Sequence, residues 1–232
     1  GLPATADGLV LDKSVLPFAA VDLDRQGLAR QARIDTAPVH RHQVDAERLA
    51  CLADIFFRRQ ADIVIAAMRD PLVTTVMLEG ALGPENRNAL AMEAVEGGYT
   101  HLWLVDADMR FPSDAWERLL AHQVDIVGLA YHRRGVPLQT TVRIQDTTGT
   151  VGIPDGPLPS TLFHAYATGS GCQLITTEAL KRMPRPWFSI GYTARGAFID
   201  DAVWFAQQAH AVGIETWCDP TIPALHIGDY EY

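Results

Sequence analysis

The segment His101-Leu102-Trp103-Leu104-Val105-Asp106-Ala107-Asp108 joins an apolar run to two carboxylates that are separated by one residue. The run is short and follows Gly97-Gly98, a pattern that predicts a turn and then a buried strand. Two Asp side chains at the end of a buried strand repel each other and lose hydration, so a cation between them would stabilise both. Oxygen ligands favour a hard ion such as Mg²⁺ or Mn²⁺. The alternative is a solvated turn in which one Asp caps the next helix.

The composition sets limits on the class of protein. Hydrophobic residues make up 48% of the 232 residues, which is enough for a sizeable core, and the formal net charge of −9 disfavours sequence-independent binding to nucleic acid. The three cysteines are widely spaced, which suits a reducing compartment. No apolar run reaches the roughly 20 residues that span a bilayer, and no secretory signal is evident. We therefore expect a cytoplasmic protein without a transmembrane segment; the sequence does not indicate its oligomeric state.

Strand-like and helix-like segments alternate along the chain, which predicts an α/β fold with a mostly parallel sheet flanked by helices. We expect a single domain over residues 1–232, in which about the first 30 residues form an N-terminal extension without a clear period. The expected strands cover residues 33–39, 73–78, 101–105, 125–131, 167–175 and 214–217. One helix is expected to begin at Asp45. Further helices are expected over residues 87–95, 114–122 (with Ser113 as N-cap), 177–183 and 201–212. Residues 189–197 are expected to form a mobile loop. Ligands of such sheets bind beyond the carboxyl ends of the strands, where Asp106 and Asp108 lie.

Several motifs follow one another along this chain. They are Glu85–Asn88, Leu104–Met109, Asp125–Gly128, Gly169–Cys172, Pro186–Phe188, Asp200-Asp201 with Trp204-Phe205, and His226. Their order resembles the GT-A-fold glycosyltransferases, especially the family 2-like enzymes of bacteria and their viruses, over roughly residues 33 to 228. The resemblance implies a Rossmann-like GT-A fold. It also implies metal-dependent transfer of a sugar from a nucleoside diphosphate sugar to an acceptor hydroxyl.

The resemblance also implies a metal site. In GT-A enzymes the Asp-x-Asp motif holds a divalent ion that bridges the diphosphate, so Asp108 is expected to bind the metal directly, and Asp106 the ribose or the metal's waters. A C-terminal His often completes the coordination, and His226 matches that position. Imidazole suits Mn²⁺ better than Mg²⁺, which favours manganese. A solvated tail residue is the alternative for His226.

The donor pocket is expected to include the Arg87-Asn88 pair and, by a shorter match, Thr36–Pro38 with Pro38 near the nucleobase. The charge and fork of an Arg suit a diphosphate. His132, Arg133 and Arg134 follow the strand expected over residues 125–131 and could touch phosphate or acceptor; the alternative is that they are solvated at the surface.

Two further motifs leave their roles open. Gly169-Ser170-Gly171 would either let the backbone approach the sugar or only form a tight turn. Trp187 and Phe188 would either form an aromatic wall for a sugar or belong to the core.

The acceptor side requires a base if the reaction inverts the anomeric centre, which we expect. Similar enzymes supply it from a Glu-Asp pair at the start of a late helix. Aligning that helix places Asp201 in the Glu position and Ala202 in the Asp position, so we favour Asp201 as the base, with Asp200 as substitute. The alternative is that one of them caps the helix. The acceptor could be a saccharide, a lipid-linked sugar, a protein or a modified nucleobase.

Two competing functions remain open at this level. A haloacid-dehalogenase-like Mg²⁺-dependent phosphatase also places Asp-x-Asp after an apolar strand, but there the strand normally lies near the N-terminus. A non-catalytic domain that binds nucleotide sugars is the other alternative, and Ala202 in the expected acid position is the feature that favours it.

Overall fold

The computed structural model describes residues 18–20, 73–78 and 83–227 of the chain. The strand expected over residues 33–39, the helix expected from Asp45 and the nucleobase contact expected at Pro38 lie outside these residues. The elements described below therefore belong mainly to the continuous stretch from residue 83 to residue 227.

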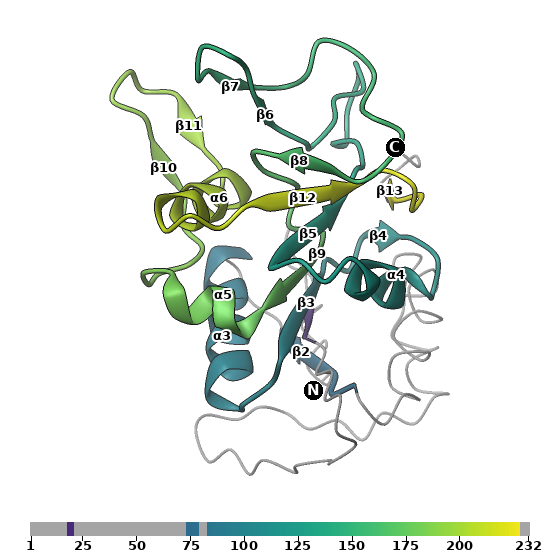
Figure 1. Cartoon of the computed structure of the whole chain (residues 1–232), viewed down its shortest axis with the longest axis vertical. Helices are drawn as coiled ribbons and strands as arrows, with labels where there is room; N and C mark the ends of the chain where they lie inside the picture. The colour runs from purple at the N-terminus through teal and green to yellow at the C-terminus, as the bar shows by residue number, and fades with distance from the viewer. Residues whose placement is uncertain (1–17, 21–72, 79–82, 228–232) are drawn as a thin grey trace, which may run out of the picture.

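A five-stranded sheet forms the centre of the structure (Figure 1). Its strands lie in the order β3 (His101–Val105), β9 (Cys172–Thr176), β5 (Ile126–Leu129), β12 (Thr216–Asp219) and β8 (Phe163–Ala165). β9 pairs antiparallel with both β3 and β5, and β12 pairs parallel with β5 and antiparallel with β8. The expectation of a mixed fold of helices and strands is confirmed for the described residues.

The expectation of a mostly parallel sheet is wrong for these strands. Parallel neighbours require a crossover connection, usually a helix, and the chain between β5 and β9 contains no helix. This connection instead carries the short strands β6 (Ile144–Gln145) and β7 (Val151–Gly152) and then β8. It leads the chain back so that β9 runs opposite to β3 and β5, and Val105, the last residue of β3, pairs with Cys172, the first residue of β9.

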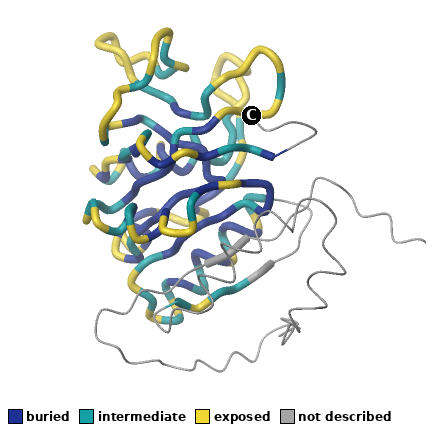
Figure 2. Tube along the Cα trace, turned by 90° about the vertical axis from the view of Figure 1, so that its right-hand side faces the viewer, coloured by how far each residue is buried: buried dark blue, intermediate teal, exposed yellow. Residues whose placement is uncertain are grey.

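Helices cover both faces of the sheet. Alternate residues of β3 point to opposite faces: Leu102 and Leu104 pack in one apolar cluster, and Trp103 and Val105 in another. The first cluster lies against α3 (Gly83–Glu96), α5 (Thr177–Arg182) and α6 (Asp201–Ala211), and the second against α4 (Ala115–Ala121). Figure 2 shows the buried residues within these layers and the exposed ones in the surrounding loops.

The helix starts differ in how they are capped. Asp114, not the expected Ser113, is the N-cap of α4, and its side chain makes no capping hydrogen bond. Thr176 caps α5 by accepting a hydrogen bond from the backbone N–H of Ala179 at 3.2 Å. Asp200 caps α6 in the same way, accepting from Val203 at 2.9 Å. The capping role at the start of α6 thus belongs to Asp200 and not to Asp201.

Small two-stranded sheets complete the described fold. They pair β1 (Phe18–Ala20) with β2 (Val76–Leu78), β4 (Met109–Arg110) with β13 (Leu225–His226), β6 with β7, and β10 (Gly191–Tyr192) with β11 (Phe198–Ile199). Residues 189–197, expected to be a loop without regular structure, thus belong largely to the β10–β11 hairpin. No helix within the described residues is both long enough and apolar enough to cross a bilayer.

Candidate functional site

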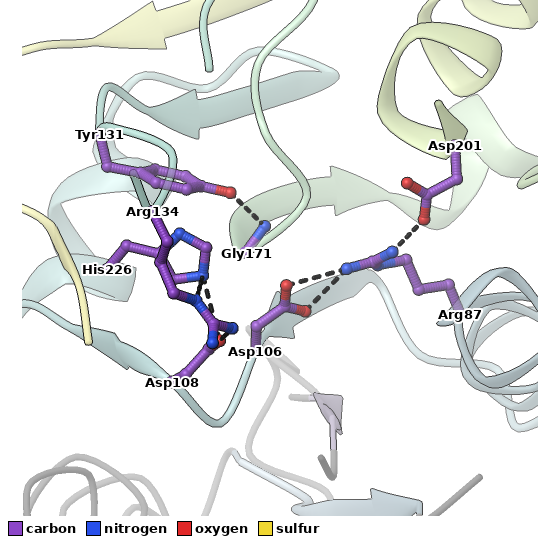
Figure 3. A network of polar contacts seen from close by, with 8 residues as sticks. All are labelled: Arg87, Asp106, Asp108, Tyr131, Arg134, Gly171, Asp201 and His226. Atoms are coloured by element: carbon purple, nitrogen blue, oxygen red, sulfur yellow. Dashed lines mark hydrogen bonds and ion pairs between the residues drawn. The ribbon is translucent and has the colours of Figure 1, made fainter. Parts of the chain in front are cut away.

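The carboxyl end of β3 carries both residues of the Asp-x-Asp motif (Figure 3). Asp106 follows the strand directly, and its carbonyl accepts a hydrogen bond from Met109 N at 3.1 Å, which closes a tight turn. Asp108 lies in this turn with only 4% of its surface exposed. The turn directs the two carboxylates to separate partners, so each Asp forms its own charged centre.

Arg87 connects the first centre to the start of α6. Its Nη2 donates to both carboxylate oxygens of Asp106, at 2.8 and 2.9 Å, and its Nη1 donates to Oδ2 of Asp201. All three side chains are largely buried. One guanidinium from α3 therefore bridges two carboxylates, one just after β3 and one at the start of α6.

The electrostatics of this centre depend on Arg87. Burial raises the pKa of Asp106, and the charges of Asp108 and Asp201 raise it further, while Arg87 acts in the opposite direction. Burial by itself would lower the pKa of Arg87, but Asp106 and Asp201 outweigh this effect and raise it. Arg87 therefore stays charged, and it is the main factor that opposes the rise in the pKa of Asp106.

Asp108 forms the second centre with His226 and Arg134. His226 Nε2 lies 3.1 Å from Asp108 Oδ2, although 118 residues separate the two in the sequence. The β4–β13 pairing produces this contact, since it sets His226 opposite Met109, and Ile227 N donates to the carbonyl of Asp108 at 2.6 Å. Arg134 donates from Nη2 to the same Asp108 oxygen, and its Nε lies 3.3 Å from His226 Nε2.

The donors and acceptors of this second centre are not all matched. His226 Nε2 faces both an acceptor, Asp108 Oδ2, and a donor, Arg134 Nε, and a single ring nitrogen cannot be protonated for one and unprotonated for the other. Asp108 Oδ2 and His226 Nε2 could both ligate a cation, and in this structure the guanidinium of Arg134 is the cationic group that contacts both. Arg134 is the more accessible partner, since its side chain is 43% exposed while that of Asp108 is 6% exposed.

The expected triad of metal ligands is only partly assembled. Asp108 and His226 meet, whereas both oxygens of Asp106 are bound to Arg87. Across residues 83–227 and the shorter described segments, no group of three or more His, Cys, Asp or Glu side chains lies close enough to hold a metal ion. A cation here would have two protein ligands and would take its others from water or substrate oxygens, as Mg²⁺ and Mn²⁺ do at phosphate sites.

A cavity of about 330 Å³ opens beside the first centre. The charged and phenolic side chains that line it are Arg87, Asp106, Tyr131, Arg133, Asp200 and Asp201. The cavity thus joins the end of β3, the loop after β5 and the start of α6.

The two acidic residues at the start of α6 have different roles. Asp200 caps the helix through Oδ1, and its Oδ2 accepts from Arg133 at 2.8 Å, so both of its oxygens are engaged. Asp201 is bound to Arg87 through Oδ2 alone, and its Oδ1 accepts no hydrogen bond from a described residue. Asp201 is therefore the better candidate for a base, as the sequence analysis had favoured.

Other candidate residues turn out to be structural. The amide of Asn88 bonds Pro84 O at 2.8 Å, Phe188 O at 2.6 Å and Phe188 N at 3.1 Å, so it joins α3 to the segment before β10 and is not available to a nucleotide. Trp187 and Phe188 are each 1% exposed, and Phe188 stacks on Phe205 with centroids 4.6 Å apart. They belong to the core and do not form a wall of the site.

Tyr131 is a residue of the site that sequence reasoning missed. It is 5% exposed, lines the cavity, and its hydroxyl accepts a hydrogen bond from Gly171 N at 2.8 Å. Burial and the nearby Asp106 raise the pKa of Tyr131, so its hydroxyl stays protonated and has a proton to donate. The glycines of the Gly169-Ser170-Gly171 segment make room for this ring: a Cβ would lie 2.2 Å from the hydroxyl oxygen at Gly169 and 2.6 Å at Gly171.

Replacing Gly171 by Ala is therefore expected to destabilise the protein by about 1–3 kcal/mol, through overpacking against Tyr131 and Met109. The same substitution is expected to cost less in a Tyr131→Phe background, because the hydroxyl that it meets is gone. Urea unfolding of the four proteins of this cycle gives both costs. Gly152→Ala is the control, since a Cβ there meets nothing within 4 Å. Equal costs in the two backgrounds would show that Tyr131 does not limit this position.

Comparison with known proteins leaves the family open. No family model matches the sequence, and a comparison with curated proteins finds no match either. Among solved structures, the chain is similar to the "Crystal Structure of A197 from STIV", with a TM-score of 0.48 and 18% sequence identity over 65% of this chain and 70% of that chain.

Proposed function

We propose that the protein is a metal-dependent glycosyltransferase of the GT-A type, which transfers a sugar from a nucleoside diphosphate sugar to an acceptor hydroxyl. The observation that carries this proposal is the meeting of Asp108 and His226, at 3.1 Å, at the carboxyl end of β3. The resemblance of the sequence assigns these two residues to one metal, and the β4–β13 pairing provides the contact. The cavity that contains Arg87 and Asp201 opens on the same edge of the sheet.

On the donor side, Asp108 and His226 would hold Mn²⁺ or Mg²⁺, which neutralises the charge that develops on the leaving diphosphate. Arg134 now bonds to both of these residues from an exposed position. Its fork of donors would be free for the diphosphate once a metal takes its place. Arg87 stays bound between Asp106 and Asp201 and fixes the distance between donor and acceptor sides.

On the acceptor side, Asp201 would accept the proton of the attacking hydroxyl. The bond from the acceptor oxygen to the anomeric carbon forms as the bond from that carbon to the diphosphate breaks, with inversion at the carbon. Arg87 engages Oδ2 of Asp201, so Oδ1 is the oxygen that would take this proton. Arg87 would hold the carboxylate of Asp201 in place while it does so.

The structure offers less support for the phosphatase alternative. That mechanism requires one Asp of the pair to attack phosphorus, yet both oxygens of Asp106 accept hydrogen bonds from Arg87 and Asp108 is bound to Arg134 and His226. Release of phosphate from simple monoesters would nevertheless favour it. A binding-only domain would bind nucleotides without hydrolysing any nucleotide sugar.

A thermal-shift screen of nucleoside diphosphates and their sugars, with and without Mn²⁺, tests the proposal. A ligand at 100 times its Kd is expected to stabilise the folded state by about 2.7 kcal/mol, so the correct nucleotide should raise the Tm clearly. The rise should disappear when EDTA removes the metal. If no nucleotide raises the Tm in the presence of Mn²⁺, the glycosyltransferase proposal is wrong.

A further inference from the structure

The β10–β11 hairpin presents aromatic side chains to solvent. Tyr192 is 72% exposed and Phe198 59% exposed, and their rings make an edge-to-face contact with centroids 5.7 Å apart. Ile190, just before the hairpin, is 56% exposed. Three of the six exposed large hydrophobic side chains in the described part of the chain thus lie here. Exposed apolar side chains that gather in one place mark interaction sites more often than isolated ones do.

Core packing does not account for these aromatic residues. The hairpin has two residue pairs, Gly191 with Ile199 and Tyr192 with Phe198, and it projects beyond α6 (Figure 1). Only its base is close-packed, where a Cβ on Gly191 would lie 3.3 Å from the ring of Trp204. A two-stranded hairpin is marginally stable by itself. Tyr192 and Phe198 therefore present apolar surface that the fold of the hairpin does not require.

This apolar surface is continuous with the cavity. Phe198 is itself one of the lining residues, together with Asp200 and Asp201 two and three positions further along the chain. A ligand that lies on the aromatic rings would therefore reach polar side chains at its far end. Such a site suits a molecule with an apolar face and a hydrogen-bonding edge.

The charges around the cavity favour a neutral ligand. Its lining holds three carboxylates, those of Asp106, Asp200 and Asp201, against the two guanidinium groups of Arg87 and Arg133. Both guanidinium groups are paired with these carboxylates. Nucleobases also stack on aromatic rings, but a nucleic-acid strand brings phosphates that need surplus cations, and the whole chain carries a net charge of −9.

We propose that the β10–β11 hairpin binds a neutral oligosaccharide as the acceptor, with its terminal pyranose ring over Phe198 and its reacting hydroxyl in the cavity. The C–H groups of a pyranose face pack on an aromatic ring, and its hydroxyls donate to carboxylates and accept from guanidinium groups. The role of this saccharide as acceptor rests on the proposed glycosyltransferase function. Its binding to the hairpin does not.

Binding of the full chain to a printed array of neutral oligosaccharides tests the proposal without requiring turnover, and the best binder is then titrated by NMR. We expect Tyr192→Ala with Phe198→Ala to weaken binding by about tenfold or more, and Tyr192→Phe to retain it within about threefold, because the ring is kept. Ile153→Ala removes an exposed apolar side chain that is not among the cavity's lining residues, and it should bind like the wild type. The Tm of each variant shows that it is folded.

Other results would overturn the proposal. The proposal is wrong if no oligosaccharide on the array binds, or if the double alanine variant binds as well as the wild type. It is also wrong if a single-stranded thymidine oligonucleotide binds in preference to the saccharides. A dimer in light scattering that the double variant converts to monomer would instead assign the hairpin to a second copy. A nucleotide that raises the Tm, with no saccharide bound by the hairpin, would reject this inference alone. Saccharide binding, with no nucleotide that raises the Tm, would reject the glycosyltransferase proposal alone.

Discussion

Asparagine in place of Asp108 is expected to abolish the binding of Mn²⁺ and to slow sugar transfer by about a thousandfold, since a metal contributes several kcal/mol to charge stabilisation in the transition state. The amide has nearly the shape of the carboxylate, so His226 and Arg134 keep a neighbour of the same size. It lacks the negative charge that a divalent cation requires. Titration with Mn²⁺ followed by electron paramagnetic resonance measures binding, and turnover of the donor found by thermal shift measures transfer.

Asp114→Asn is the matched control for this prediction. Asp114 lies six residues further on, is exposed, and makes no capping hydrogen bond with its side chain, so the same chemical change there should leave Mn²⁺ binding unaltered. If Asp108→Asn bound Mn²⁺ as well as this control does, the metal would have to lie elsewhere and Arg134 would be a permanent partner of Asp108.

The strand β3 and the position of its two Asp residues were predictable because both depend on local sequence. The four apolar residues Leu102 to Val105 favour a buried strand, and the acidic pair that follows then lies at its carboxyl end. The helices α3 and α6 were predicted within a few residues because the glycines that follow them, Gly97 and Gly213, mark their ends in the local sequence.

Contacts between distant segments were not predictable from the residues alone. The direction of β9 depends on the path of a long connection without a helix, and nothing in its local pattern of apolar residues records that path. The approach of His226 to Asp108 depends on β4 and β13, which have two residues each and are too short to give a periodic signal. Only the family resemblance pointed to His226.

The partners of the charged residues were the hardest part of the site to predict. Arg87 and Arg134 were both expected near a diphosphate or acceptor, yet each is bound to an Asp of the motif. A sequence shows that opposite charges are present but not which of them will pair. Tyr131 was not predicted, because a Tyr beside a strand resembles any core residue in the sequence. Its special position is visible only in the structure, where two glycines surround its hydroxyl.

Methionine in place of Arg87 is expected to have the largest effect on stability, a loss of about 3–5 kcal/mol at neutral pH, because it leaves two largely buried carboxylates without their cation. Activity should also fall, since Asp106 and Asp201 would repel each other. One control is Arg182→Met, which breaks an exposed pair with Asp125 at 3.6 Å and an exposed hydrogen bond to Val212 O at 3.1 Å, and it should cost at most about 1 kcal/mol. The other is the triple variant Arg87→Met, Asp106→Asn, Asp201→Asn, which removes both carboxylate charges and should regain most of the loss.

The pH dependence of the Arg87→Met variant separates lost charge neutralisation from lost packing. Without Arg87, the pKa of Asp106 in the folded state rises further above its value in the unfolded chain, so the folded state binds more protons. Its free energy of unfolding must then increase as the pH falls toward the range in which Asp106 protonates, and decrease as the pH rises through it. Urea unfolding between about pH 5 and pH 8, compared with the wild type and the triple variant, measures this slope. A deficit that stays constant across this range would mean that Arg87 stabilises the fold through packing, and that it does not lower the pKa of Asp106.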